Sequence, residues 1–134
     1  MAFAVEHIGI VAVSGMVGGI ARFWLSGFIA HRIGERFPWG TLVVNVSGAF
    51  AIGALAALLP AFGSGSGARL TLWLALAVGI LGSYTTVSSF SLQTLALLRE
   101  KELLRALLNI ITSLSLCLSA AIAGYLSIME TFGN

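Results

Sequence analysis

The sequence contains very few charged residues. Only 9% of its 134 residues are Asp, Glu, Lys or Arg, whereas 58% are hydrophobic. A soluble globular domain carries roughly 25% charged residues, so this composition does not supply a water-exposed surface. Disordered chains are polar and charged, which excludes disorder as well. The sequence therefore indicates a small integral membrane protein and argues against an enzyme.

Cysteine and basic clusters are also scarce. The single cysteine, Cys117, excludes an intramolecular disulfide. The formal net charge is only +2, and no basic stripe with interleaved aromatic residues is present. We therefore expect no nucleic-acid partner.

Uncharged stretches long enough to cross a membrane recur along the chain. No charged residue lies between Arg36 and Arg69, between Arg69 and Arg99, or between Arg105 and Glu130. A spanning helix needs about 20 residues, so each stretch predicts one. The sequence thus predicts an all-α integral membrane protein with four transmembrane helices, at about 8–30, 41–60, 70–97 and 104–128.

The first of these stretches spans the membrane only if Arg22 is included. A cleaved signal peptide is the alternative, but the N-terminal region carries Glu6 and no Lys or Arg. Arg22 stays protonated, so it can attract an anion but cannot relay protons. Its alternative role is to extend its guanidinium to the membrane interface.

Acidic residues are missing from the predicted membrane interior. All five lie in loops or tails: Glu6, Glu35, Glu100, Glu102 and Glu130. A proton-coupled transporter normally needs an embedded ionisable group that carries its proton. The polar residues inside the spans are instead neutral, namely Asn45 and several hydroxyl side chains. Such a lining can replace the hydration shell of an ion, so the sequence favours a pore or a scaffold over a proton pump.

The third span has an unusual centre. Residues 79–91, with the sequence GILGSYTTVSSFS, contain two Gly and six Ser or Thr. Gly is a poor helix former, and Ser and Thr side chains can bond backbone groups in place of the helical ladder. Irregular backbone persists in a membrane only when it is buried in protein or lines a watery cavity. We predict a break near Gly82–Thr85, and the alternative is an unbroken helix whose hydroxyls bond its own carbonyls.

Three motifs in order resemble the Fluc (CrcB) family of fluoride channels. Residues 18–23 read GGIARF, similar to the family pattern G-G-x-x-R-aromatic. Residues 37–48 read FPWGTLVVNVSG, similar to P-W-G-T-L-x-x-N-x-x-G. Residues 82–91 read GSYTTVSSFS, similar to G-G-x-T-T-F-S-T-F-S. The resemblance covers nearly the whole chain.

The resemblance implies a passive channel that exports cytoplasmic fluoride through a bacterial inner membrane. It implies an antiparallel, dual-topology dimer with two pores, in which the third helix is broken at mid-membrane. It further implies a structural sodium ion at the dimer interface. Backbone carbonyls of Gly82 and Thr85 would hold this ion.

The same resemblance implies the residues of the pore. Arg22 would lie in the vestibule, and the expected lining comprises Asn45, Ser88, Ser89, Phe90 and Ser91. Ser113 is expected to face the pore as well, although no motif fixes it. Val87 stands where the family has a first pore phenylalanine, which puts half of the aromatic lining in doubt.

Two alternatives to a self-sufficient channel remain open in the sequence. A small four-helix, dual-topology multidrug exporter fits the length, but it needs a membrane-embedded Glu. The second alternative is a non-conducting subunit of a heteromeric fluoride channel, and the observation behind it is Val87.

The charge pattern adds to this second alternative. The loops between helices 1 and 2 and between helices 3 and 4 hold five Lys or Arg, whereas the other side holds only Arg69. This bias favours one orientation, and the antiparallel partner would then be a homologous second subunit.

Overall fold

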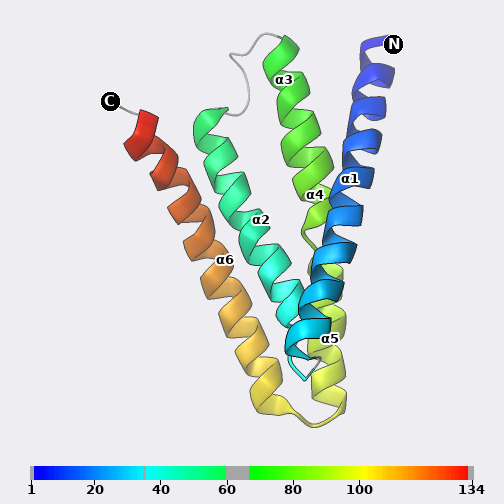
Figure 1. Cartoon of the computed structure of the whole chain (residues 1–134), viewed down its shortest axis with the longest axis vertical. Coiled ribbons are helices and arrows are strands. Elements are labelled where there is room, and N and C mark those ends of the chain that lie inside the picture. Colours follow the sequence, from blue (N-terminus) through cyan, green and yellow to red (C-terminus); the bar gives the residue numbers. More distant parts are fainter. Residues whose placement is uncertain (1, 35, 60–66, 133–134) are drawn as a thin grey trace.

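The computed structural model describes residues 2–34, 36–59 and 67–132, and within these ranges every regular element is helical. The elements are α1 (Ala2–Ile33), α2 (Trp39–Leu58), α3 (Gly67–Trp73), the π-helical segment η1 (Leu74–Leu81), α4 (Gly82–Tyr84), α5 (Val87–Arg99) and α6 (Leu103–Phe132) (Figure 1).

The prediction of four apolar helical spans is confirmed. Among the described residues, four helical stretches are long and apolar enough to cross a membrane: Val5–Ile33, Trp39–Leu58, Gly67–Arg99 and Leu103–Phe132. Each contains or closely matches one predicted span, and position 60, the expected end of the second, lies outside the described residues. Both described ends of the chain lie at one end of the molecule, and the α1–α2 and α5–α6 connections lie at the other (Figure 1).

The third span is built from four elements and is irregular in two places. In η1 the helix is widened, and at its end the Gly82 N–H donates to the Ala77 carbonyl five residues back. The helical path continues through α4, so Gly82 itself is helical. Extended backbone follows at Thr85 (φ −79°, ψ 158°) and Thr86 (φ −151°, ψ 121°), before α5 begins at Val87. The extended residues thus lie at the end of the predicted segment and one position beyond it.

Close backbone contacts join α2 to α6. A Cβ atom added to Gly53 would overlap the Ala121 carbonyl, and one added to Gly124 would overlap the Phe50 carbonyl. These two glycines therefore let the helices approach closely, as small residues commonly do in membrane proteins. Figure 1 shows α6 running beside α2 along much of its length.

Glycines also join α1 to the third span. A Cβ atom added to Gly18 would overlap the Ile80 carbonyl, and one added to Gly79 would overlap the Ser14 side chain. The Ser14 hydroxyl donates to the Ile10 carbonyl at 2.7 Å, so this polar side chain is satisfied within its own helix. α1 is thereby packed against the half of the third span that precedes Thr85.

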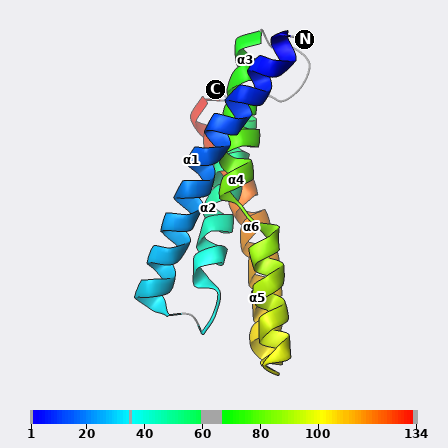
Figure 2. The same ribbon diagram turned by 90° about the vertical axis from the view of Figure 1, so that its right-hand side faces the viewer.

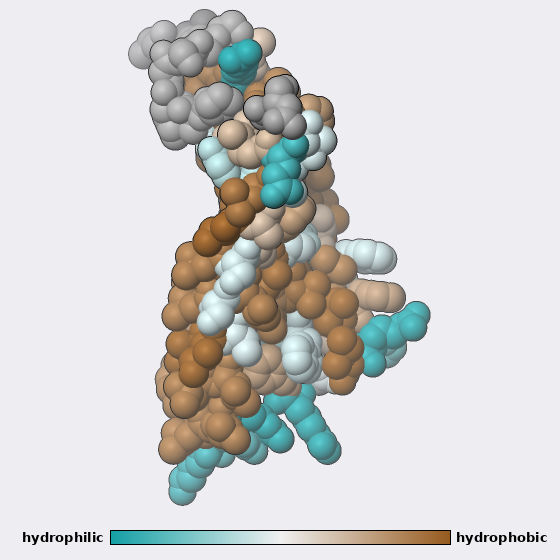
Figure 3. All heavy atoms as spheres, turned by 90° about the vertical axis from the view of Figure 1, so that its left-hand side faces the viewer, coloured by the Kyte–Doolittle hydropathy of each residue, from teal (hydrophilic) through white to brown (hydrophobic). Residues whose placement is uncertain are grey.

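Little of the apolar surface is buried within one chain. The buried hydrophobic residues are Leu42, Val44, Ala77, Leu97 and Ala106. Large apolar side chains cover the outside of the helices, while hydrophilic residues gather toward the ends (Figure 3). Such a surface is stable against lipid or another subunit and not against water.

Candidate functional site

The side chain of Asn45, on α2, is bonded to the extended backbone of Thr86. Its Nδ2 donates to the Thr86 carbonyl at 2.9 Å, and its Oδ1 accepts from the Thr86 N–H at 2.8 Å. Leaving a buried backbone group unpaired costs about 1–3 kcal/mol. One amide side chain therefore satisfies both backbone groups of a residue that has left the helical ladder.

The Thr86 hydroxyl organises the start of α5. Thr86 is only 7% exposed, and its Oγ1 accepts from the Ser89 N–H at 3.1 Å, which makes it the N-cap of α5. The same oxygen lies 3.1 Å from Ser88 Oγ and 3.2 Å from Ser89 Oγ. Two of the predicted pore serines are thus tied to one capping threonine.

The geometry around Thr86 fits a cation held by backbone oxygens. In an unbroken helix the Gly82 carbonyl would accept from the Thr86 N–H, and the Thr85 carbonyl from the Ser89 N–H. Here both N–H groups donate to side-chain oxygens instead. The described residues contain no group of three His, Cys, Asp or Glu that could hold a metal. The ligands available here to a hard cation are therefore main-chain and hydroxyl oxygens.

Two cavities lie on either side of Thr86, which lines both. One has a volume of about 290 Å³, and its lining includes Arg22, Ser88 and Ser89. The other has a volume of about 360 Å³, and its lining includes Asn45, Gly82, Thr85, Val87 and Cys117. The structure therefore groups seven predicted site residues around Thr86. Neither cavity lining contains a carboxylate, and the side chains that line the 360 Å³ cavity are mainly apolar.

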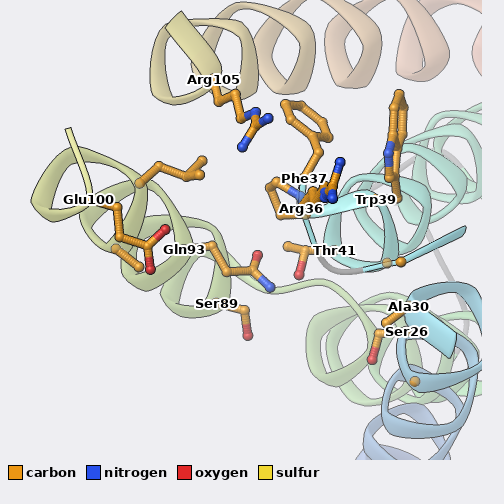
Figure 4. A pocket seen from close by; sticks show the side chains of 16 residues that line it. Ser26, Ala30, Arg36, Phe37, Trp39, Thr41, Ser89, Gln93, Glu100 and Arg105 are labelled. Atoms are coloured by element: carbon orange, nitrogen blue, oxygen red, sulfur yellow. The ribbon is translucent and has the colours of Figure 1, made fainter. Parts of the chain in front are cut away.

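A larger pocket of about 610 Å³ lies at the end of the molecule that holds the two connections. It shares Ser26, Thr41 and Ser89 with the 290 Å³ cavity, so the two spaces adjoin. Figure 4 shows side chains of α1, α2, α5 and α6 around this pocket, Arg105 of α6 among them, together with Arg36 from the α1–α2 connection. Figure 2 shows that the α1–α2 and α5–α6 connections are splayed apart at this end.

Basic, acidic and amide side chains line this outer pocket, among them Arg36, Glu100, Arg105 and Gln93. The Arg105 guanidinium lies 3.2 Å from the Glu102 carboxylate, which offsets part of its charge. Gln93 Oε1 is buried and has no hydrogen-bond partner among the described residues. Because the Nε2 donors lie on the same side chain, the Gln93 amide can present either a donor or an acceptor group to an occupant of the pocket.

Three predicted site residues line none of these three cavities. Phe90 is half-buried, and its carbonyl accepts from the Thr94 hydroxyl at 2.8 Å. Ser91 is exposed on α5. Ser113 is buried on α6, 9% exposed. Within a single chain these three residues therefore contribute to none of the three cavities.

Val87 is 77% exposed in the single chain and is also part of the lining of the 360 Å³ cavity. Thr86 itself was not among the residues predicted from sequence. Its signal was available, because a Thr directly before a helical segment is a common N-cap.

Most of the chain matches known relatives. A family described as "CrcB-like protein, Camphor Resistance (CrcB)" matches residues 9–125. The "Fluoride-specific ion channel FluC 2" of Rhodopseudomonas palustris (strain BisB18) is 55% identical over 121 residues, which cover 90% of this chain and 92% of the relative. The "Fluoride-specific ion channel FluC 4" of Brucella abortus biovar 1 (strain 9-941) is 50% identical over 126 residues, 94% of each chain.

A more distant relative also matches most of the chain. The "Fluoride-specific ion channel FluC" of Methylocella silvestris is 45% identical over 118 residues, which cover 86% of this chain and 87% of the relative. Four apolar spans and channel relatives together make this a multi-pass membrane protein. The chain belongs to the CrcB family.

Proposed function

We propose that this chain forms a fluoride-selective, passive anion channel that exports cytoplasmic fluoride and so reduces its toxicity. The observation that carries this proposal is family membership, with relatives named fluoride-specific ion channels that match at 45–55% identity over most of their length. The polar groups around Thr86 support it, because they include hydroxyl groups, an amide and the Arg22 guanidinium but no carboxylate that would repel an anion.

The proposed anion path begins at the outer pocket and continues to the 290 Å³ cavity. Arg22 lies in the lining of this cavity and is the cation that would draw fluoride toward Ser88 and Ser89. Hydroxyl groups can rotate to donate hydrogen bonds to a desolvated anion. Apart from Glu100 at the outer pocket, the two linings contain no carboxylate, and the transport that we propose follows the fluoride gradient alone.

Asn45, Phe90, Ser91 and Ser113 complete the pore in this proposal. An aromatic ring carries partial positive charge at its edge, so Phe90 can offer that edge to an anion. Val87 cannot, since its side chain has no such edge. The channel therefore relies on one pore phenylalanine per chain where the family pattern has two.

The active form that we propose is an antiparallel dimer of this chain in a bacterial inner membrane. The apolar surface that a single chain leaves exposed supports association with lipid and with a second copy. A sodium ion would supply a positive charge where carbonyl dipoles converge between the subunits. Gly82 and Thr85 are the residues whose carbonyls would hold it.

A second candidate is a subunit that conducts only with an oppositely oriented homologue. The observation in its favour is the uneven charge of the two ends of the molecule. One end holds five cations, Arg32, Arg36, Arg99, Lys101 and Arg105, while Arg69 is the cation near the other end. By the positive-inside rule such a chain prefers a single orientation.

Fluoride efflux from liposomes that contain this chain alone tests the proposal, with chloride efflux as the matched control. We expect rapid fluoride efflux without a proton gradient and little chloride efflux. Equal efflux of both anions would refute selectivity. No efflux from well-folded protein, restored by co-expression with a homologue of opposite charge bias, would favour the second candidate.

A further inference from the structure

We propose that Asn45 and Thr86 are positioning residues for a cation site at the end of α4. Neither side chain needs to touch the cation. Each accepts a backbone N–H that a continuous helix would give to a carbonyl: Asn45 takes the Thr86 N–H, and Thr86 Oγ1 takes the Ser89 N–H. The two carbonyls released in this way belong to Gly82 and Thr85. The inference rests on the proposed sodium site and assigns how this chain builds it.

The helical hydrogen bonds remain regular as far as the Thr85 nitrogen and are interrupted after it. The Thr85 N–H still donates to the Leu81 carbonyl at 3.0 Å, as in a regular helix, and the Thr85 hydroxyl donates to the same oxygen at 3.0 Å. The helix therefore persists up to the Thr85 nitrogen. Only at the next residue does a side chain from α2 replace the helical acceptor.

The Asn45 amide is well suited to hold this geometry because it pairs with both backbone groups of Thr86. The two bonds, at 2.9 and 2.8 Å, fix the orientation of the peptide groups on either side of Thr86. Contact between α2 and α4 is close here as well, since a Cβ atom on Gly48 would overlap the Thr85 methyl group. α2 thus determines the course of the backbone that presents both carbonyls.

Removal of either acceptor should weaken the cation site without removing a ligand. A buried N–H that loses its partner is costly, so it would turn back to the helical carbonyl four residues earlier. That carbonyl would then share its lone pairs between an N–H and the cation. Changes in groups that orient metal ligands typically reduce metal affinity about 10–100-fold.

The first experiment compares Thr86→Val with Thr86→Ser in the full-length protein purified in detergent. Unfolding temperature is followed by the fluorescence of the three Trp residues while Na⁺ replaces N-methyl-D-glucamine at constant ionic strength. A cation that binds only the folded state raises this temperature. We expect Thr86→Val to raise the half-saturating Na⁺ concentration by about tenfold, whereas Thr86→Ser keeps the acceptor and stays near the original value.

Thr71→Val is the matched control, because Thr71 bonds the Gly67 carbonyl on α3 and lines none of the cavities described above. It should leave the Na⁺ dependence unchanged. If Thr86→Val and Thr71→Val respond to Na⁺ alike, the positioning role is refuted.

A second pair of variants tests Asn45 and covers the case in which Thr86→Val does not fold. Asn45→Leu removes both bonds and should raise the half-saturating Na⁺ concentration by about tenfold. Asn45→Asp keeps an oxygen for the Thr86 N–H, so it should retain Na⁺ stabilisation even though its charge suppresses fluoride efflux. Loss of Na⁺ stabilisation in Asn45→Asp would contradict the inference.

The two proposals fail in different ways. Unsubstituted protein that conducts fluoride but gains no stability from Na⁺ would refute the cation site and leave the channel intact. Protein that is stabilised by Na⁺ but conducts no fluoride would refute the channel and leave the positioning role in place.

Discussion

Two regions of the molecule hold helices together by opposite means. Along the contact of α2 with α6, which we call the glycine seam, Gly53 and Gly124 let backbones meet with no polar side chain between them. Around Thr86, which we call the break region, a polar side chain from α2 bonds backbone that has left the helix. α2 takes part in both regions, so one helix packs regular backbone on one face and supports irregular backbone on another.

The difference between the two regions indicates which substitutions should change stability and which should change ion binding and transport. Close packing at the glycine seam depends on shape and tolerates no added atoms. The break region depends on paired hydrogen bonds, and it is where most of the predicted fluoride and sodium ligands lie. We therefore expect substitutions in the seam to act on folding, and substitutions near the break to act on ion binding and transport.

The largest effect should come from Gly124→Val, which breaks the glycine seam. Its added side chain would overlap the Phe50 carbonyl, which is backbone and cannot rotate away. Overpacking typically costs about 1–3 kcal/mol, and contact with backbone places this variant at the upper end. Thermal unfolding followed by circular dichroism should show a large loss of stability.

Gly9→Ala is the control for this substitution, because a Cβ atom at Gly9 meets nothing within 4 Å. Alanine is the better helix former by about 1 kcal/mol, so this variant should be as stable as the original or slightly more. Equal destabilisation by both variants would show that close contact with backbone does not set the cost of substitution at the seam.

A smaller effect, on transport and not on folding, is expected from Phe90→Ala. Loss of an aromatic interaction is worth about 0.5–1.5 kcal/mol, which corresponds to a fall in fluoride efflux of roughly two- to tenfold. Circular dichroism and gel filtration should show unchanged helicity and assembly. Fluoride efflux at the original rate would remove Phe90 from the proposed pore.

The spans were predictable from sequence, but their internal irregularities were predictable only in part. Gaps between charged residues located all four spans, because charge is costly in a membrane wherever it occurs. The composition of residues 79–91 pointed to irregular backbone at Gly82–Thr85. In the structure Gly82 is helical, and the extended residues are Thr85 and Thr86. A glycine weakens a helix, but the backbone leaves the helix at the residue whose N–H and C=O groups have another hydrogen-bond partner, here Thr86.

That partner could not be identified from local sequence. Asn45 lies 41 residues before Thr86, and only the packing of α2 against the third span brings them together. The widened helix of η1 was likewise not predictable, because its apolar sequence has no pattern that distinguishes it from a regular helix. Motif resemblance named Asn45 as a pore residue, whereas its bonds to Thr86 emerge only from the fold.

Val87→Phe should change fluoride efflux through the break region without loss of stability. Val87 is 77% exposed in the single chain, so a larger side chain meets little resistance there. A second ring edge for the anion would raise fluoride efflux by up to a few-fold, on the scale of about 0.5–1.5 kcal/mol for an aromatic interaction. An unchanged rate in liposomes would show that the native valine already suffices for conduction.

The smallest effect should come from Asn109→Leu. This variant tests whether loss of any buried amide changes stability and Na⁺ dependence, or only loss of an amide that bonds irregular backbone. Asn109 is 2% exposed on α6, and its Nδ2 donates to Thr94 Oγ1 on α5 at 2.9 Å. Thr94 keeps its own bond to the Phe90 carbonyl, so no backbone group is left unpaired by the substitution. Hydrogen bonds between membrane helices average about 0.6 kcal/mol, and Leu replaces Asn at similar size, so the loss of stability should be slight.

The Na⁺ dependence of unfolding should also stay the same in Asn109→Leu, in contrast to Asn45→Leu. If both variants shifted the Na⁺ dependence equally, the special role of the Asn45–Thr86 pair would disappear, and the break region would differ from the rest of the bundle only in its backbone course.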